Sequence, residues 1–164
     1  MKSVLISIRP KWCEKIASGD CNILVKKSAP KEVPFKAYIY CTKDKPYLYR
    51  IDDDNNFELT NTLRPKTYDY VKDYNEQNGK VIGEFICDKV STYPRNYKFG
   101  YEISENEFNE TALMAEQFVD YGNGGTLYGW HISDLKIYEK PLSLSELGVT
   151  RPPQSYQFVE ELEK

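Results

Sequence analysis

Short stretches of alternating or continuous apolar residues predict a chain built mainly of β-strands. In the first, residues 3–9, Val4, Ile6 and Ile8 share one face, which indicates a strand with one well-buried side. Further strands are predicted at 23–25, 35–42, 80–93 and 127–138, and a hairpin at 47–51 and 57–59 around the turn 52–56.

Two segments have the features of helices. Pro10 suits a first helical position, because its missing N–H would have no partner there, and it opens the run 11–18. Gly19 is a natural terminator for this helix, since it has no Cβ to clash at positive φ. A second helix is predicted from Thr111, as its cap, to Tyr121, with an apolar face made of Leu113, Met114, Phe118 and Tyr121.

Several strands with two helices predict an α+β fold, a small curved sheet or barrel with helices at its openings. The 164 residues are enough for one domain with a real core. The strand 127–138 is followed by a loop or single turn at 141–147 and an extended tail containing Arg151, Pro152 and Pro153.

The cysteines and the chain start bear on compartment and cofactors. Cys13, Cys21, Cys41 and Cys87 form no CxxC pair and share the chain with a single histidine, so neither a metal site nor a cofactor is expected. The sequence shows no signal pattern and no apolar run long enough for a bilayer. It therefore predicts a reduced, cytoplasmic protein without membrane association, whose cysteines are mostly buried.

Charge is distributed unevenly along the chain. The net charge is −3, yet residues 1–50 contain eleven Lys or Arg against four Asp or Glu. This basic amino-terminal third favours an anion-binding face, although a scattered set of solvated lysines would give the same count. The 14 tyrosines fit either a strand-rich core rim or a contact surface.

The junction between the first helix and the second strand concentrates the candidate anion-binding groups. The helix end at Gly19 leads into a strand that carries Lys26 and Lys27, so backbone donors and two ammonium groups surround one place. Helix amino termini attract phosphate, so the residues around the start of this helix are further candidates for anion binding. The candidate residues near the junction are Ser7, Arg9, Lys11, Trp12, Cys21, Lys26 and Lys27.

The order of strand, proline-started helix, Ser-Gly stop and basic strand resembles the ASCH domain of the PUA-like superfamily, in the small form found in bacteria and their phages. The resemblance covers most of the chain as one domain, 1–164, and is poorest at an insertion around 44–78 and at 95–110. It implies a PUA-like small curved β-barrel with a cleft beside the first helix, suited to RNA, a nucleotide or a modified nucleoside.

The diagnostic motif of that family, GxKxxExR, is degenerate here. The glycine is Gly19, but the lysine, glutamate and arginine positions hold Cys21, Leu24 and Lys26. Some ASCH proteins hydrolyse the acyl group of an acetylated cytidine with the motif lysine and a threonine three residues later, a position that is also Leu24 here. An amide hydrolase needs an activated nucleophile and a group that takes its proton. The resemblance therefore implies ligand binding without acyl-hydrolase activity.

Two enzyme hypotheses remain open. A Cys21 thiolate could act as the nucleophile of an amidohydrolase if a nearby positive charge lowered its pKa. Some ASCH proteins have been proposed to cut RNA, which here would require His131 with Glu84 or Asp134 as an acid and base pair. A phage-type module that binds another protein is a third reading.

The segment 128–133 adds a second set of candidates. In a strand, Trp130 shares one face with apolar neighbours, whereas His131 and Ser133 share the other with Gly129. If the polar face lines the cleft, His131 and Ser133 can bond a base or phosphate and a nearby aromatic can stack. Trp130 can equally be a core anchor. Arg95, which follows the strand end at Pro94, and tail residues Gln154 and Ser155 could close the same cleft.

Overall fold

The computed structural model describes residues 1–43, 48–51, 57–60, 78–96 and 100–162. Strands dominate it and short helices join them, so the predicted α+β class is confirmed. In chain order the elements are β1 (Lys2–Ile8), α1 (Pro10–Ser18), β2 (Ile23–Lys26), β3 (Phe35–Cys41), β4 (Leu48–Ile51), β5 (Phe57–Thr60), β6 (Lys80–Cys87), β7 (Val90–Tyr93), β8 (Arg95–Asn96), β9 (Gly100–Tyr101), α3 (Glu105–Glu110), α4 (Ala115–Gly122), β10 (Leu127–His131), β11 (Ser133–Leu142), a 3-10 helix (Leu144–Leu147) and β12 (Tyr156–Val159).

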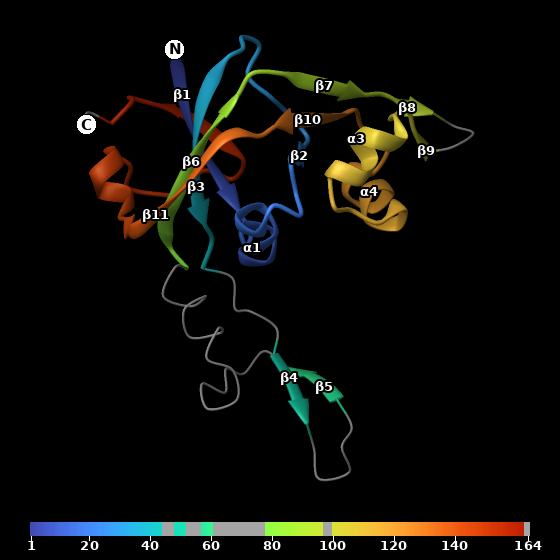
Figure 1. The fold of residues 1–164 in the computed structure, drawn as a ribbon, viewed down its shortest axis with the longest axis horizontal. Helices are drawn as coiled ribbons and strands as arrows, with labels where there is room; N and C mark the ends of the chain where they lie inside the picture. Colours follow the sequence, from blue (N-terminus) through green and yellow to red (C-terminus); the bar gives the residue numbers. More distant parts are fainter. Residues whose placement is uncertain (44–47, 52–56, 61–77, 97–99, 163–164) are drawn as a thin grey trace.

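Five strands form the main sheet in the order β11-β6-β3-β1-β12 (Figure 1). β1 and β3 are parallel, and α1 with β2 supplies the connection that parallel neighbours require. Val4 and Ile6 face one core cluster, whereas Leu5 packs with Tyr38 on the opposite face. β1 is thus buried on both sides, not on the single side predicted, because it lies inside the sheet with apolar layers above and below.

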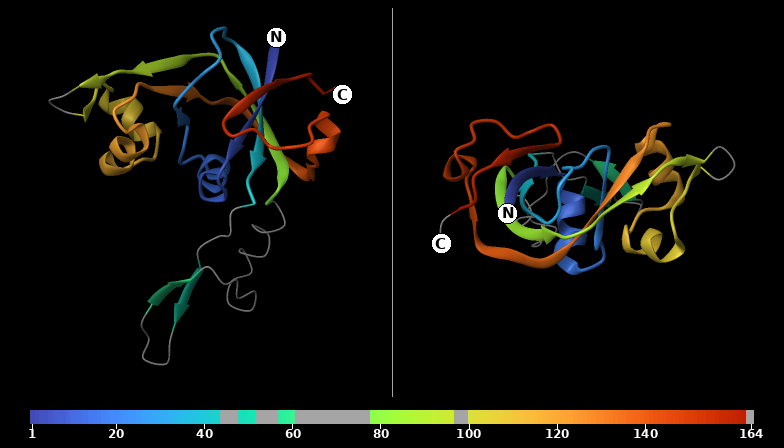
Figure 2. Two further views of the ribbon diagram at one scale, coloured as in Figure 1. Left: turned by 180° about the vertical axis from the view of Figure 1, so that it is seen from behind. Right: turned by 90° about the horizontal axis from the view of Figure 1, so that it is seen from above.

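A second sheet holds β2, β10 and β7 in that order, all antiparallel. α3 and α4 lie together beside this sheet, apart from the main one (Figure 1). Phe118 of α4 anchors them through ring contacts with Tyr93, at 5.8 Å, and Tyr101, at 5.1 Å between centroids. The chain termini lie near each other beside the main sheet in both views of Figure 2, as expected from the pairing of β1 with β12.

Helix α1 forms as the sequence predicts. Pro10 occupies its first turn, and Gly19 ends it in the left-handed conformation, φ 88°, with its N–H donated to the Ile16 carbonyl at 3.2 Å. Cys13 and Ile16 are buried in the main core. This burial fixes the helix against the sheet, and the chain then turns into β2.

The two long strands predicted at 80–93 and 127–138 are each two strands in different sheets. β6 and β11 pair in the main sheet, whereas β7 and β10 pair in the second. The break between β10 and β11 falls at Ile132, two residues before Asp134, which adopts φ 49°. The His131 N–H donates to the Lys89 carbonyl at 3.1 Å. Alternation of apolar and polar residues continues from β6 into β7 and from β10 into β11, because each of these strands buries one face. Periodicity alone therefore did not reveal that the chain changes sheet.

The helix predicted from Thr111 to Tyr121 is also wrong in its start. Thr111 ends α3 instead of opening a helix, and Ala112 adopts φ 59°, which separates α3 from α4. The cap of α3 is Ser104, whose hydroxyl accepts the Glu107 N–H at 3.2 Å. Ser104 and Glu107 have the spacing of an amino-terminal cap, a local signal within the acidic run.

The predicted hairpin forms, with β4 and β5 antiparallel and Leu48 opposite Thr60; its turn, 52–56, lies outside the described residues. The 141–147 segment, predicted as loop or turn, begins as the end of β11 before the 3-10 helix. The described strands form four separate hydrogen-bonded sheets, and a closed PUA-like barrel stays a prediction. No described helix has the length and apolar character needed to cross a membrane.

Candidate anion-binding cleft

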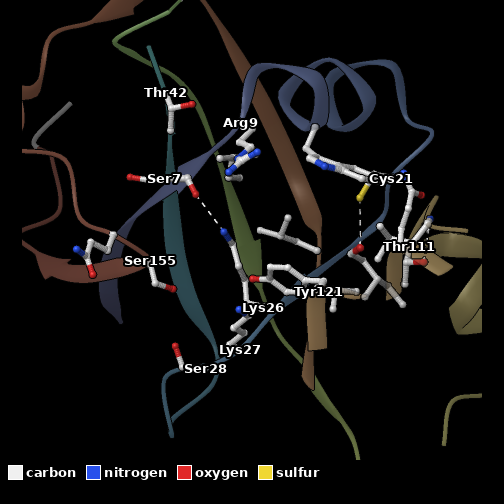
Figure 3. Close-up of a pocket in the computed structure, with 18 residues that line it drawn as sticks. Ser7, Arg9, Cys21, Lys26, Lys27, Ser28, Thr42, Thr111, Tyr121 and Ser155 are labelled. Atoms are coloured by element: carbon white, nitrogen blue, oxygen red, sulfur yellow. Dashed lines mark hydrogen bonds between the residues drawn. The ribbon is translucent and has the colours of Figure 1, made fainter. Parts of the chain in front are cut away.

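A cleft of about 840 Å³ lies between the end of β1, the start of α1, strand β2 and the α3–α4 segment (Figure 3). Its volume falls within the range of small-molecule sites, about 300–1,000 Å³. Six of the predicted site residues line it: Ser7, Arg9, Trp12, Cys21, Lys26 and Lys27. Gln154 and Ser155 of the tail line it as well. Tertiary folding therefore brings together the helix start, the basic strand and the tail.

The cleft is cationic although the protein is acidic. Arg9, Lys26 and Lys27 line it, and no aspartate or glutamate does so among the residues that the structure describes. Figure 3 shows Lys26 at the end of β2 and Lys27 directly after it, with Arg9 beyond them toward α1. A concave surface with one sign of charge raises the local concentration of an oppositely charged ligand. An anion is the chemistry that this surface favours.

Lys26 is the most deeply placed of these cations. Its Nζ donates a hydrogen bond of 3.0 Å to the Ser7 carbonyl. Burial of the ammonium is the main cause that lowers the pKa of Lys26 to about 8, and the neighbouring Arg9 charge acts in the same direction. A bound anion would offset both penalties.

Two aromatic residues accompany the cations. Lys27, which is exposed, places Nζ 4.9 Å from the ring centroid of Tyr121. On the α1 side, Lys15 lies over the Trp12 ring at 4.7 Å. Trp12 and Tyr121 are both partly buried and both line the cleft. Aromatic faces beside cations are suited to planar rings that carry a negative group.

The cleft also contains an unsatisfied hydroxyl. Thr42 Oγ1 is buried and has no hydrogen-bond partner. It follows β3, whose parallel register with β1 brings it beside Ser7 (Figure 3). A buried polar atom without a partner costs free energy, so a ligand oxygen or water there would be stabilised. Sequence reasoning missed Thr42, although the parallel pairing of the two strands would have revealed it.

The lining residues of the α3–α4 segment were also missed: Thr111, Leu113, Gln117 and Tyr121. Leu113 and Tyr121 carried a signal, because they were assigned to the apolar face of a predicted helix. The Thr111 hydroxyl is already engaged, donating to the Phe108 carbonyl at 2.7 Å and accepting from the Leu113 N–H at 3.2 Å. Its position reflects the junction between α3 and α4, which the pattern did not predict.

All three altered positions of the ASCH motif face this cleft. Cys21, Leu24 and Lys26 line it, so their side chains decide its chemistry. Cys21 is only 2% exposed, and its thiol donates to the Ile23 carbonyl at 3.2 Å. Burial raises the pKa of the Cys21 thiol to about 11, so the thiolate is scarce at neutral pH. This environment argues against Cys21 as a nucleophile.

Five predicted site residues do not line the cleft: Lys11, Arg95, Trp130, His131 and Ser133. Trp130 is fully buried, with its ring 5.1 Å from that of Phe35 and its Nε1 donating to the Ser28 carbonyl at 3.1 Å. Trp130 is therefore a core residue, as the second of its two predicted roles had it, and not a ligand contact.

The other outlying candidates have local roles. Ser133 Oγ donates to the Ile86 carbonyl at 2.9 Å. Arg95 lies 5.9 Å from the Tyr101 ring, and Lys11 Nζ lies 6.0 Å from the Trp12 ring. None of these contacts points to a ligand.

His131 belongs to a separate polar group beneath α3, which we call the Glu107 cluster (Ser91, Tyr93, Glu107 and His131). Glu107 Oε1 accepts from Ser91 at 2.6 Å and Tyr93 at 3.0 Å, and lies 3.1 Å from His131 Nε2. The Ser91 bond is the main cause that holds the pKa of Glu107 below its usual value. His131 therefore pairs with Glu107 and not with Glu84, which bonds Tyr138 at 2.8 Å and Lys36 at 3.1 Å.

Comparison with known proteins depends on the fold. No family model matches the sequence, and no curated protein does. A crystal structure of ASCH from Zymomonas mobilis, however, superposes with a TM-score of 0.64 over 98% of this chain and 89% of that one. The chain has the ASCH fold. A tyrosine-to-phenylalanine variant and a serine-to-alanine variant of the Zymomonas protein match with the same TM-score and cover 92% and 89% of those chains.

Sequence identity to these structures is 17%. The ASCH fold, suggested by the order of strand, helix and basic strand, is thereby confirmed for the chain as a whole. At this low identity, the comparison establishes that the two proteins share a fold and nothing about what they bind. What this chain binds has to be argued from its own cleft.

Proposed function

We propose that this protein is a single ASCH domain that binds RNA, a nucleotide or a modified nucleoside in the cleft, without acyl-hydrolase activity. The observation that carries the proposal is a concave site with three cations, two partly buried aromatic rings and no described carboxylate. Cations suit phosphate, and aromatic faces stack with bases. The partner-free Thr42 hydroxyl supplies a further donor for a phosphate oxygen or a base edge.

The lack of hydrolase activity is proposed from the residues at the motif positions. Leu24 offers no hydroxyl or carboxylate, and the Cys21 thiol is buried and hydrogen-bonded to a carbonyl. His131, the alternative acid or base, is held in the Glu107 cluster, and neither His131 nor Glu107 lines the cleft. These environments weigh against both enzyme hypotheses.

Binding is tested with a labelled single-stranded RNA and a mononucleotide over a series of salt concentrations. If three cations contact phosphates, log K should fall against log salt with a slope of about −2 for single strands. Lys27→Glu should weaken binding at least about tenfold, which corresponds to about 1.4 kcal/mol. Lys31→Glu is the matched control, because Lys31 is exposed and does not line the cleft. Flat salt dependence, or equal losses in both variants, would reject the proposal.

The hydrolase part is tested separately with an acetylated cytidine. We expect no turnover by the parent protein at neutral pH, and no rapid alkylation of Cys21 in the folded state, because its thiol is protonated and buried. Product release measured by chromatography, lost in Cys21→Ala, would overturn this part and leave the binding proposal intact.

A further inference from the structure

Lys26 differs from Lys36, another partly buried lysine of the fold. Lys36 Nζ lies 2.7 Å from Glu161 and 3.1 Å from Glu84, and its bond to Glu161 is the main cause that raises its pKa. Lys26 Nζ instead contacts the neutral Ser7 carbonyl, and the described residues place no carboxylate within ion-pair distance of it. The same side chain thus has a charged partner at one site and a neutral partner at the other.

The titratable groups around Lys26 do not supply the missing negative charge. Arg9 and Lys27 are cations, and Cys21 and Tyr121 are the other ionisable groups lining the cleft. Cys13, on the neighbouring helix, has a thiol pKa raised well above its usual value, with the hydrogen bond to Cys41 as the main cause. At neutral pH these thiols and the phenol are uncharged, so the groups that the structure describes around Nζ are neutral or positive.

A lysine in such surroundings gives up its proton more easily than a surface lysine, and the neutral amine is a nucleophile. With the pKa of Lys26 near 8, its neutral fraction at pH 7 exceeds that of an ordinary lysine by about two hundredfold. Lys26 also lines the cleft, so a ligand can reach it.

We propose that Lys26 is a reactive amine that captures an anionic aldehyde or ketone in the cleft as an imine. The Nζ lone pair forms a bond to the carbonyl carbon, the two N–H protons of the neutral amine are transferred to the carbonyl oxygen, the C–O bond breaks as that oxygen leaves as water, and the C=N bond results. Hydrolysis reverses the step and restores both partners, so no oxidant or reductant is needed. The anionic group of the ligand lies against Arg9 or Lys27, and the Thr42 hydroxyl can hydrogen-bond the carbonyl oxygen before it leaves.

The reactive lysine and the proposed binding function belong to the same cleft. The inference rests on the proposed function only in requiring that the cleft attracts anions. An oxidised ribose phosphate or a small phosphorylated aldehyde would meet both requirements. A plain nucleotide would bind without the covalent step. The two proposals therefore fail separately.

The test uses pyridoxal 5′-phosphate as an anionic aldehyde probe, followed by borohydride reduction and peptide mass spectrometry of the folded full chain. Lys26 should be labelled at least about tenfold faster than Lys36 at pH 7, and its labelling rate should level off above pH 8, since the neutral fraction then approaches one. Lys26→Arg should keep the positive charge and abolish the labelled peptide, whereas Lys36→Met should not change it.

The possible outcomes decide between the proposals. Equal labelling of all lysines, or a labelled site other than Lys26, overturns the inference even when RNA binding persists. Selective labelling of Lys26 in a protein that binds neither RNA nor nucleotide supports the inference and rejects the proposed function. Because labelling is measured first on the parent protein, a variant that fails to fold does not prevent the decision, and loss of selectivity in urea confirms that the fold creates the reactivity.

Discussion

Strand β2, which lines the cleft, belongs to the same sheet as β7 and β10, which carry most of the Glu107 cluster, yet the charged groups of the two regions have opposite environments. Three hydrogen-bond partners converge on Glu107 Oε1, and their effect lowers its pKa. Lys26 bonds a neutral carbonyl, and burial lowers its pKa. Both groups are partly buried, so exposure does not distinguish them.

This difference in charge partners distinguishes a group that stabilises the fold from a group that is available to a ligand. A charge whose partners are all supplied by the protein holds elements together, and here Glu107 ties α3 to β7 and β10. A charge left without an opposite partner costs stability, which is the usual condition of a residue that serves a ligand. The only histidine of the chain, an obvious catalytic candidate in the sequence, belongs to the first kind.

The largest effect is expected from breaking the Glu107 cluster. Glu107→Ala should lower the free energy of unfolding by about 3 kcal/mol, because the hydroxyls of Ser91 and Tyr93 lose their acceptor. Urea unfolding at pH 7 measures the change. Glu105→Ala, in the first turn of the same helix but exposed, should cost less than about 1 kcal/mol. Equal losses in the two variants would show that the cluster adds nothing to stability.

A smaller effect of opposite sign is expected at Lys26. Its folded pKa, about 8, lies below the unfolded value, so the charged side chain lowers stability fully below pH 8 and this cost disappears as the pH rises through the unfolded pKa, about 10.4. Lys26→Met should therefore stabilise the fold at pH 7 by about 1–2 kcal/mol while weakening RNA binding. The loss of the Ser7 bond is already included in this range.

Thermal unfolding of Lys26→Met and its parent, compared at pH 7 and pH 10, checks both the sign and the trend. Lys36→Met is the matched control and should destabilise the fold, because Glu84 and Glu161 lose their cation. A destabilised Lys26→Met, or a gain that grows with pH, would contradict the contrast between the two lysines.

The smallest effect is expected at Arg95. It lies against the Tyr101 ring, outside the cleft, so Arg95→Ala should change RNA affinity by less than about twofold. Fluorescence anisotropy at one salt concentration measures this. A loss as large as that of Lys27→Glu would mean that the anion-binding surface extends beyond the cleft to β8.

Local sequence signals were sufficient to predict structure where the residues that determine an element lie within one short segment. Pro10 and Gly19 fix both ends of α1, and the basic strand follows directly. Seven of the eleven candidate site residues come from this part of the chain and the strand before it, and all of them except Lys11 meet in the cleft because few residues separate them. The ASCH fold was suggested by the same segment.

Predictions were poorer where two distant segments had to be compared. The ribbons at 80–93 and 127–138 keep their alternation through a change of sheet, since burial of one face is all that the pattern records. His131 and Ser133 were assigned to the cleft from that pattern, but the turn at Ile132 and the packing of α3 direct them elsewhere. Helix α3 was not predicted, because its main local signal, the Ser104 cap, lies within an acidic run.

The sequence by itself determined the strand-rich α+β class, the capped helix α1 and the presence of basic residues beside it, because these follow from periodicity, glycine and proline geometry and charge within a short stretch. Only the tertiary structure decided that Thr42 and Tyr121 join those residues, that Trp130 and His131 do not, and that no carboxylate of the described residues pairs with Lys26. Each of these depends on which distant segment packs alongside, and burial and charge compensation are properties of that packing.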